Sequence, residues 1–296
     1  MNFLVSGGTG FIGSALIPEL EAEGHRVNRL TREPRSGGDI RWDPDAGKIE
    51  ADLAGFDAVI HLGGESIAEG RWTPEKKRRI LESRQKGTRL LAEKIAELPE
   101  PPSVMISASA IGYYGDRGNE LLTEESEPGS LFLSEVCKKW EAAAEPAREA
   151  GIRVVHPRFG IVLSTEGGAL GTTLPIFKLG GGGKIGSGRQ YWSWVAFDDV
   201  VGAIVHAIDT DALSGPVNVV SPNPPTNAEY TKVLGRVLGR PTFFAVPAPT
   251  LRVAIGGMAD DLLLASARVE PTRLEETGYE YRHPELEGAL RYLLEK

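Results

Sequence analysis

The chain has 296 residues, of which 41% are hydrophobic and 25% charged, the proportions of an ordinary soluble globular protein. Its net charge of −8 and the lack of a basic run interleaved with aromatic residues argue against a nucleic-acid partner. The single cysteine, Cys137, excludes a disulfide framework and a cysteine-based zinc site, and we expect no metal. No apolar leader and no run of roughly 18 apolar residues appear, so we expect a cytoplasmic chain without a membrane partner.

The N-terminal stretch combines a short strand, a glycine-rich turn and a helix. An apolar run over 3–5 leads into Gly7, Gly10 and Gly13, and residues 12–20 carry helical spacing. Glycine is needed where a turn takes unusual backbone angles and where backbone approaches a pyrophosphate, and the N-terminus of the next helix attracts the same anion. This order predicts a dinucleotide site, with a ligand-free glycine turn as the alternative. The residues expected to contact the cofactor here are Gly7, Thr9, Gly10, Phe11, Ile12 and Gly13.

The second strand, expected over 26–30, ends next to Arg32, with Arg29 and Arg35 nearby. An acidic residue at this position would bind the 2′-hydroxyl of NAD, whereas an arginine binds the 2′-phosphate of NADP. We therefore predict Arg32 as a cofactor contact and NADP in preference to NAD. The alternative is that these arginines only face solvent.

The pattern then alternates strands and helices. Strands are expected over 39–43, 56–64, 103–109, 152–156 and 216–220, and helices over 73–98, 131–150, 200–208 and 227–238. The alternation predicts an α/β fold, a Rossmann-type doubly wound parallel sheet with a smaller C-terminal region for substrate binding or packing. Ligands bind at the carboxyl ends of such strands, which adds Leu62, Gly63, Gly64, Ser107 and Pro157 to the expected cofactor contacts.

We predict two domains. The NADP-binding domain is expected over 1–246, with its substrate-side elements mainly over 164–246, and a small helical domain over 247–296. The C-terminal domain is interpreted as a packing or dimerisation element, which makes a homodimer one expected assembly, with a substrate lid as the alternative. Asp198 and Asp199 are expected to cap the helix over 200–208, and His61 to pack in the core.

The motifs resemble the short-chain dehydrogenase/reductase superfamily in its extended form. The matching segments are Gly7–Gly13, His61–Gly64, Ser107–Ser109 before Tyr114–Gly115, and Trp194–Asp199. More narrowly, the chain is similar to an NAD-dependent epimerase/dehydratase subgroup of unknown substrate, sometimes labelled cell-division-inhibitor-like, which has a C-terminal domain of unknown function. That subgroup shows Gly64–Ile67, Arg71–Thr73, Ser83–Arg84, Gly112–Gly115 and Trp140–Glu141. The resemblance covers essentially the whole chain and implies an oxidoreductase or isomerase.

The chain departs from this superfamily at its proton-transfer pair. Active members carry a Tyr-x-x-x-Lys pair followed four residues later by a glutamate. Counting back from Glu141 places Cys137 at the lysine position and Leu133 at the tyrosine position, and neither can do that work. Arg84 stands where an asparagine is expected. The resemblance thus implies a cofactor site without the usual catalytic pair.

Four residues are candidates for catalysis. Ser109 would bind a substrate oxygen, Tyr113 or Tyr114 would supply the missing phenol, and Glu65 would act as a base or hydroxyl acceptor. A strand-end serine and structural tyrosines are the alternatives. The residues expected to contact substrate are Arg71, Trp72, Gly186, Arg189, Tyr191 and Trp192, with helix capping or a rigid turn as the alternative.

Two functions of different classes follow. The first is an NADP-binding oxidoreductase or epimerase that acts on a small hydroxylated substrate, of which a nucleotide-linked sugar is one form. The second is a catalytically silent NADP-binding sensor or scaffold, which has lost the Tyr-x-x-x-Lys pair because it performs no chemistry.

Overall fold

The structure, a computed structural model, describes residues 1–295, which form two compact units. Unit 1 consists of Met1–Ser109, Val136–Pro157 and Ile204–Val217. Unit 2 consists of Ala110–Glu135, Arg158–Ala203 and the chain from Asn218 onward. Both units are assembled from interleaved segments of the chain. This division therefore does not test the boundary between two sequential domains that we expected at residue 246, and that boundary stays a prediction.

Unit 1 is organised around a twisted sheet whose order is β13-β9-β6-β5-β1-β2-β3-β4. The strands are β1 (Asn2–Ser6), β2 (Arg26–Thr31), β3 (Asp39–Asp43), β4 (Lys48–Ile49), β5 (Ala58–His61), β6 (Val104–Ser107), β9 (Arg153–Phe159) and β13 (Gly215–Val219). The pairs from β9 to β3 are parallel, and β4 adds an antiparallel edge. Strands β2, β3 and β4 follow β1 toward one side of the sheet, and β5, β6, β9 and β13 then follow one another toward the other side. The predicted doubly wound fold is confirmed, with its switch point between β1 and β5.

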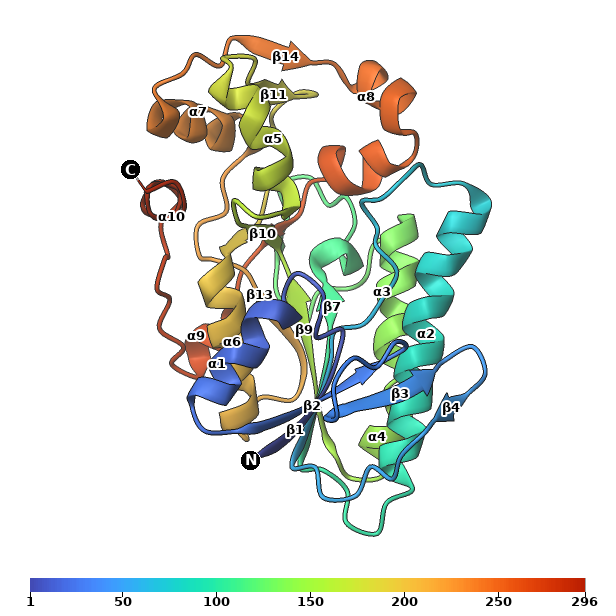
Figure 1. The fold of residues 1–296 in the computed structure, drawn as a ribbon. Coiled ribbons are helices and arrows are strands. Elements are labelled where there is room, and N and C mark those ends of the chain that lie inside the picture. Colours follow the sequence, from blue (N-terminus) through green and yellow to red (C-terminus); the bar gives the residue numbers. More distant parts are fainter. Residues whose placement is uncertain (296) are drawn as a thin grey trace. The chain divides into compact units, whose positions relative to one another are not determined.

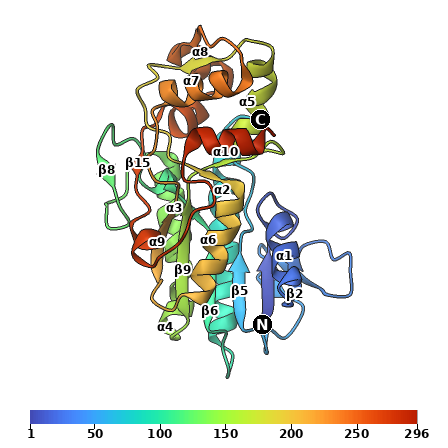
Figure 2. The same ribbon diagram turned by 90° about the vertical axis from the view of Figure 1, so that its left-hand side faces the viewer.

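Helices cover both faces of this sheet. Figures 1 and 2 show α1 (Gly13–Ala22) and α6 (Phe197–Asp209) on one face, and α2 (Pro74–Ala96) and α4 (Glu145–Glu149) on the other. On the α2 face, Leu4, Val59, Met105 and Val154 are register partners on four successive strands and belong to one buried apolar cluster. Buried parallel strands of this kind read as continuous apolar runs, which is why the sequence identified them.

The expected helix over 131–150 is instead two helices, so this prediction was wrong in one respect. α3 (Phe132–Ala142) ends before α4 begins at Glu145, and Pro146 lies in the first turn of α4. Proline has no N–H to bond to the carbonyl four residues earlier, so it cannot continue α3 but suits the start of a new helix. The other long helix, α2, begins as expected, with the Thr73 side chain accepting from the N–H of Lys76.

Unit 2 contains three two-stranded sheets, β10–β12, β11–β14 and β15–β8, surrounded by short helices. Its strands are β8 (Leu121–Leu122), β10 (Ile161–Leu163), β11 (Gly183–Ile185), β12 (Trp194–Ala196), β14 (Phe244–Val246) and β15 (Arg268–Val269). The short strand β7 (Ser109–Ala110) pairs instead with β9 of the large sheet. Its helices are η1 (Ile111–Tyr113), α5 (Gly168–Lys178), α7 (Asn227–Leu238), α8 (Ala248–Ile255), η2 (Ala259–Leu264), α9 (Thr272–Glu276) and α10 (Leu286–Leu293). Over residues 1–295, no helix has the combination of length and apolar character that a membrane span requires.

Asp199 holds the C-terminal segment of unit 2 and does not have the capping role that we expected. Helix α6 starts at Phe197, so Asp199 lies inside its first turn, fully buried. Its carboxylate accepts hydrogen bonds from the N–H of Arg282 at 2.7 Å, the N–H of His283 at 3.0 Å and the hydroxyl of Tyr279 at 3.2 Å. A buried carboxylate persists only when donors compensate its lost hydration, and here a distant part of the chain supplies them.

We predict that Asp199→Asn lowers the free energy of unfolding by about 1–3 kcal/mol, because an amide group would face a backbone N–H that then has no acceptor. Urea denaturation followed by circular dichroism measures the change. The control is Asp211→Asn, at a fully exposed side chain whose nearest cation is 3.8 Å away, where we expect less than about 1 kcal/mol. Equal effects of both substitutions would contradict the anchoring role.

Candidate functional site

The backbone of the glycine turn after β1 packs directly against the backbone of Leu62 and Gly63 after β5. Gly7 has a φ of +73°, and a Cβ added there would lie 2.8 Å from the N of Gly63 and from the carbonyl carbon of Leu62, at the end of β5. A Cβ on Gly13, the first residue of α1, would overlap the Gly7 carbonyl oxygen and lie 2.7 Å from the Cα of Gly8. Both positions therefore require glycine, and the absence of side chains leaves the backbone of the turn exposed at the strand ends.

A groove of about 920 Å³ opens at this edge of unit 1. Most of its lining comes from the glycine turn, from the segment after β5, and from the end of β2 with the segment that joins it to β3. These places supply Gly7, Gly8, Thr9 and Gly10; Leu62, Gly63, Gly64, Glu65 and Ser66; and Arg29, Leu30, Thr31, Arg32, Glu33, Arg35 and Asp39. Residues 41–45, in β3 and the turn after it, and Ser83 and Lys86 of α2 complete the lining. It lies at the topological switch point, where doubly wound sheets bind their ligands.

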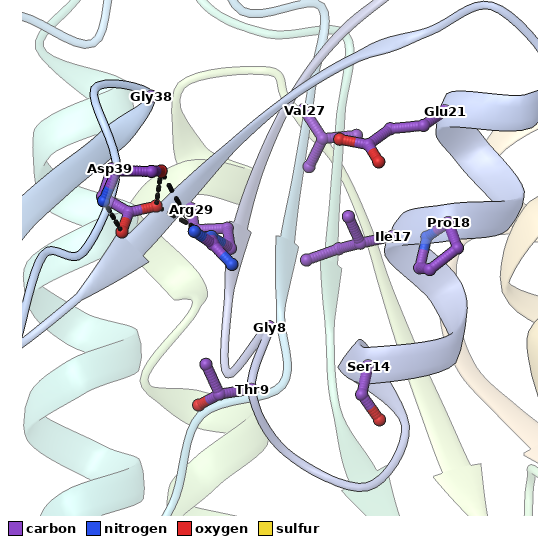
Figure 3. Close-up of a pocket in the computed structure, with 11 residues that line it drawn as sticks. Gly8, Thr9, Ser14, Ile17, Pro18, Glu21, Val27, Arg29, Gly38 and Asp39 are labelled. Carbon is purple, nitrogen blue, oxygen red and sulfur yellow. Dashed lines mark hydrogen bonds and ion pairs between the residues drawn. The ribbon is translucent and has the colours of Figure 1, made fainter.

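A second, smaller cavity of about 500 Å³ adjoins this groove. The two share Gly8, Thr9, Arg29 and Asp39. Figure 3 shows Arg29 and Asp39 on one side of the smaller cavity and Ser14, Ile17 and Pro18 of α1 on the other. The sequence drew attention to Arg29 only as a neighbour of Arg32, and it gave no reason to select Asp39.

The carboxylate of Asp39 is almost completely enclosed, with 3% of its side chain exposed. Its Oδ1 accepts from the Nε of Arg29 at 2.7 Å and from the hydroxyl of Ser36 at 3.0 Å. Its Oδ2 accepts from the N–H of Arg35 at 2.7 Å and the N–H of Ser36 at 3.0 Å. Burial by itself raises the pKa of Asp39, but these hydrogen bonds outweigh it and lower the pKa to about 2.

Arg32 differs from its neighbours in having no hydrogen-bond or ion-pair partner within residues 1–295. Its side chain is exposed and lines the groove. Arg35 lies 3.7 Å from Glu33, and Arg41 lies 3.7 Å from Glu50. Arg32 therefore brings the one uncompensated positive charge among these arginines, as an anion site requires.

The predicted cofactor contacts lie in three places. Gly7, Thr9, Gly10, Arg32, Leu62, Gly63 and Gly64 line the groove. Phe11, Ile12 and Gly13 follow the turn into α1, whereas Ser107 is buried at the end of β6 and Pro157 is buried inside β9. The Ser107 hydroxyl has no hydrogen-bond partner among the described residues. As contacts of a ligand, all of these remain predictions.

Glu65 is already paired within unit 1. Its Oε1 lies 2.7 Å from the Nζ of Lys76 and 3.4 Å from the Nε of Arg79. The hydrogen bond from Lys76 is the main reason that the pKa of Glu65 is lowered, so this residue stays a carboxylate and is a weak base. Its neighbour on the same loop, Trp72, donates its indole N–H to the carbonyl of Ile67 at 2.8 Å, and Arg71 is exposed.

Ser109 has a partner that the sequence did not reveal. Its hydroxyl donates to Oε1 of Glu141 at 2.6 Å, and Ser109 is 2% exposed. A serine has one proton to donate, so in this arrangement its oxygen offers only lone pairs to a further group.

His61 is completely buried, and its pKa is lowered to about 4 by burial and then by the nearby charge of Arg84, in agreement with a core role.

In unit 2, the two adjacent tyrosines have different surroundings. Tyr114 is fully buried, its hydroxyl donates to Asn218 Oδ1 at 2.7 Å, and it accepts from Arg158 at 2.9 Å. Burial raises its pKa to about 12 in spite of Arg158, which makes it a poor proton donor or base near neutral pH. Tyr113 is half-buried, with the Arg158 guanidinium 3.5 Å from the centre of its ring.

The other substrate contacts expected in unit 2 are also unequal. Trp192 is buried in a second apolar cluster, which lies in unit 2, and its ring centre is 5.3 Å from that of Tyr230. Its indole therefore packs in the core of this unit. Tyr191 is half-buried beside Arg268, Arg189 is exposed, and Gly186 takes a φ of +56° in a turn. Within residues 1–295, no group of three metal-ligating side chains is positioned to hold an ion.

Comparison with known proteins gives the site its context. The model of the NAD dependent epimerase/dehydratase family matches residues 3–221, about three quarters of the chain. The chain belongs to this family. Residues 246–293 match a domain of unknown function, DUF1731. The combination confirms the resemblance to the extended short-chain dehydrogenase/reductase subgroup that has this C-terminal domain.

Several relatives of this family member match it along almost its whole length. Epimerase family protein MT2273 of Mycobacterium tuberculosis is 40% identical over 290 residues, covering 97% of this chain and 96% of that protein. The crystal structure of human epimerase family protein SDR39U1 (isoform 2) with NADPH is 37% identical, has a TM-score of 0.93, and both chains are covered completely. A nucleoside-diphosphate sugar epimerase from Corynebacterium glutamicum is 38% identical with a TM-score of 0.83; the match covers 99% of this chain and 58% of that one.

The two positions at which this chain lacks the Tyr-x-x-x-Lys pair hold side chains that are buried. Leu133 is 7% exposed and Cys137 is 3% exposed. Lys138, next to Cys137, is exposed on α3. Arg84 stacks over the Trp140 ring at 4.8 Å and donates to the carbonyl of Glu65 at 2.9 Å. Its guanidinium thus contacts two motifs of the subgroup, Gly64–Ile67 and Trp140–Glu141. The sequence motifs alone did not indicate this contact.

We predict that Gly13→Ala lowers the free energy of unfolding by about 1–3 kcal/mol, because its methyl group would push the glycine turn away from α1. Gly288→Ala is the matched control: no atom lies within 4 Å of its added Cβ, and it lies inside α10. Alanine favours a helix there, so the control should be neutral or stabilising by up to about 1 kcal/mol. Urea denaturation of both variants checks this, and an unaffected Gly13→Ala protein would show that the turn is not tightly packed.

Proposed function

We propose that this family member binds NADP(H) and acts as an oxidoreductase or epimerase on a small hydroxylated substrate. The observation that carries the proposal is the groove at the switch point, where the uncompensated charge of Arg32 lines the end of β2. The NADPH named in the human SDR39U1 structure supports the same cofactor, since that protein is 37% identical over the full chain.

The residues present fit a dinucleotide. A Cβ at Gly7 or Gly13 would fill the space between the turn, β5 and α1, so these glycines let a pyrophosphate approach bare backbone at the start of a helix. Leu62, Gly63 and Gly64 line the groove, and the two glycines leave room for the adenosine half of the dinucleotide. Arg32 would bind the 2′-phosphate, which distinguishes NADP from NAD.

A nucleotide-linked sugar is our leading substrate class. The support is the description of the Corynebacterium glutamicum protein as a nucleoside-diphosphate sugar epimerase, at 38% identity. Arg71, Arg189, Tyr191 and Gly186 are the residues that we propose for its recognition, since the first two are exposed cations that suit a diphosphate. Trp72 would contribute through its ring face, whereas buried Trp192 would act only by supporting Tyr191.

When bound, NADP supplies hydride acceptance and return at its nicotinamide ring, so that a secondary alcohol loses a hydride and a proton to give a ketone. Ser109 would hold the substrate oxygen. Its proton, which is directed to Glu141 in this structure, would turn to the alcohol oxygen, so that Ser109 donates one hydrogen bond to that oxygen and the alcohol hydroxyl keeps its own proton for a base. The proton would pass to a base and return from it when the hydride is returned.

Among the three candidates for this base, Tyr113 is the best supported. The hydroxyl of Tyr114 is buried between Arg158 and Asn218 with its pKa raised to about 12. Glu65 is a weak base because Lys76 lowers its pKa, although its carboxylate can accept a substrate hydroxyl. Tyr113 is partly exposed and lies four residues after Ser109 in the chain.

A catalytically silent NADP-binding sensor or scaffold is the second candidate. The observation that favours it is the conversion of the Tyr-x-x-x-Lys positions into the buried packing residues Leu133 and Cys137. Such packing fits a chain in which these positions no longer serve chemistry.

We expect NADPH to bind more tightly than NADH, as measured by titration of NADPH fluorescence and by calorimetry. Arg32→Ala should weaken NADPH binding roughly 10–100-fold and change NADH binding less than about threefold, since it removes one charge-assisted contact to the 2′-phosphate. Arg78→Ala removes the same charge from an exposed position on α2 and is the control. A protein that binds NADH at least as tightly as NADPH would refute the proposed cofactor.

Turnover separates the two functions. We expect NADP-dependent oxidation or epimerisation with at least one member of a panel of nucleoside-diphosphate sugars and simple secondary alcohols, monitored by NADPH absorbance and by chromatography. Ser109→Ala should lower kcat about 100-fold or more while NADPH binding persists, because it removes the group that holds the substrate oxygen. Tight NADPH binding without turnover across the panel would favour the sensor.

A further inference from the structure

The carboxylate of Asp39 has no hydrogen-bonding capacity left. An ionised carboxylate offers about four lone-pair sites, and four donors reach this one, two on each oxygen. Only 3% of the side chain is exposed. An acidic residue near the adenosine end of a dinucleotide groove usually suggests a ribose 2′-hydroxyl partner and therefore NAD. Asp39 cannot take that role without giving up a donor that it already holds.

The four donors all come from the wall of the proposed 2′-phosphate site. One is Arg29, the register partner of Asp39 on the neighbouring parallel strand, and the others are the N–H of Arg35 and the N–H and hydroxyl of Ser36. Ser36 in turn accepts from a terminal nitrogen of Arg29 at 3.0 Å. The exposed segment from Arg32 to Gly38 is thereby folded back onto the start of β3, and the guanidinium of Arg29 is held in one orientation.

Arg29 keeps capacity for an anion in this arrangement. Its Nε and one terminal nitrogen are bonded to Asp39 and Ser36, and its side chain is 35% exposed where it lines both cavities. Thr9 and Gly8 of the glycine turn line the same shared wall. A phosphate there would meet the remaining N–H groups of Arg29 and the charge of Arg32.

We propose that Asp39 is a positioning residue for cofactor specificity, which folds the segment 32–38 and orients Arg29 so that the place where the two cavities meet binds the 2′-phosphate of NADP. The inference rests on the proposed function, because it presumes that the groove binds the dinucleotide. It assigns the preference for NADP to an acidic residue, opposite to the usual reading of an acid at this edge of the sheet.

The test compares wild type with Asp39→Asn and Ser36→Ala. Asn keeps the size of the side chain but replaces acceptor sites with an amino group, and Ala removes one hydroxyl without changing any charge. The readout is the ratio of the NADH and NADPH dissociation constants, supported by calorimetry with adenosine 2′,5′-bisphosphate against 5′-AMP. A general loss of stability weakens both members of each pair and leaves the ratio unchanged.

We expect the ratio to fall at least about tenfold in Asp39→Asn and about threefold in Ser36→Ala. Asp57→Asn is the control: its carboxylate also accepts a backbone N–H, that of Asn2 at 2.6 Å, but at the amino ends of β1 and β5, away from the groove at their carboxyl ends. Its ratio should stay within twofold of wild type. A ratio that rises in Asp39→Asn while Ser36→Ala is unaffected would mean that Asp39 only repels the phosphate, and would overturn the inference.

Failure of the proposed function has a different signature. If the wild-type chain binds neither dinucleotide, or does not prefer NADPH, the proposed cofactor is refuted and this inference with it. If wild type prefers NADPH and both variants keep its ratio, Asp39 has no part in specificity and the inference alone is overturned.

Discussion

The contact between the turn after β1 and the end of β5 is the constraint on which unit 1 depends. At this point two backbones and a helix N-terminus meet without any side chain between them, because Gly7 and Gly13 leave no Cβ to separate them. The close approach lies at the switch point, where the chain continues from β1 and from β5 to opposite sides of the sheet. The same absence of side chains that permits the packing also exposes the backbone N–H groups that a pyrophosphate needs. Structural and functional requirements for glycine therefore coincide here.

Around this contact, the charged side chains differ in whether their charge is already compensated. Asp39 and Glu65 are each held by several donors, and their pKa values are lowered as a result. Such groups shape segments of the groove and have little capacity left for a ligand. Arg32 has no such partner within residues 1–295, so its charge is available to an anion.

Unit 2 shows how a buried polar network restricts chemistry. Arg158 is 2% exposed and contacts both tyrosines, through the ring of Tyr113 and the hydroxyl of Tyr114. Tyr114 completes its hydrogen bonds internally, and the network satisfies groups that would otherwise be costly to bury. From the sequence, Tyr113 and Tyr114 were equal candidates because they are adjacent. The structure distinguishes them, since adjacent residues on a short helical turn point in different directions.

Local order was what the sequence determined. Apolar runs, the glycine spacing of residues 7–13 and the Thr73 cap predicted most strands of the unit 1 sheet, the turn and the start of α2, because each depends on residues close together in the chain. The sequence analysis did not predict β4 or the short strands of unit 2. The parallel sheet and the groove at its switch point followed from that order through general rules of chain topology. Only the tertiary structure decided which polar groups are already paired: Asp199 with residues 279–283, Ser109 with Glu141, and Asp39 with Arg29 on the neighbouring strand. Hydrogen bonding and burial act over a few ångströms in space, and sequence separation carries no measure of that distance.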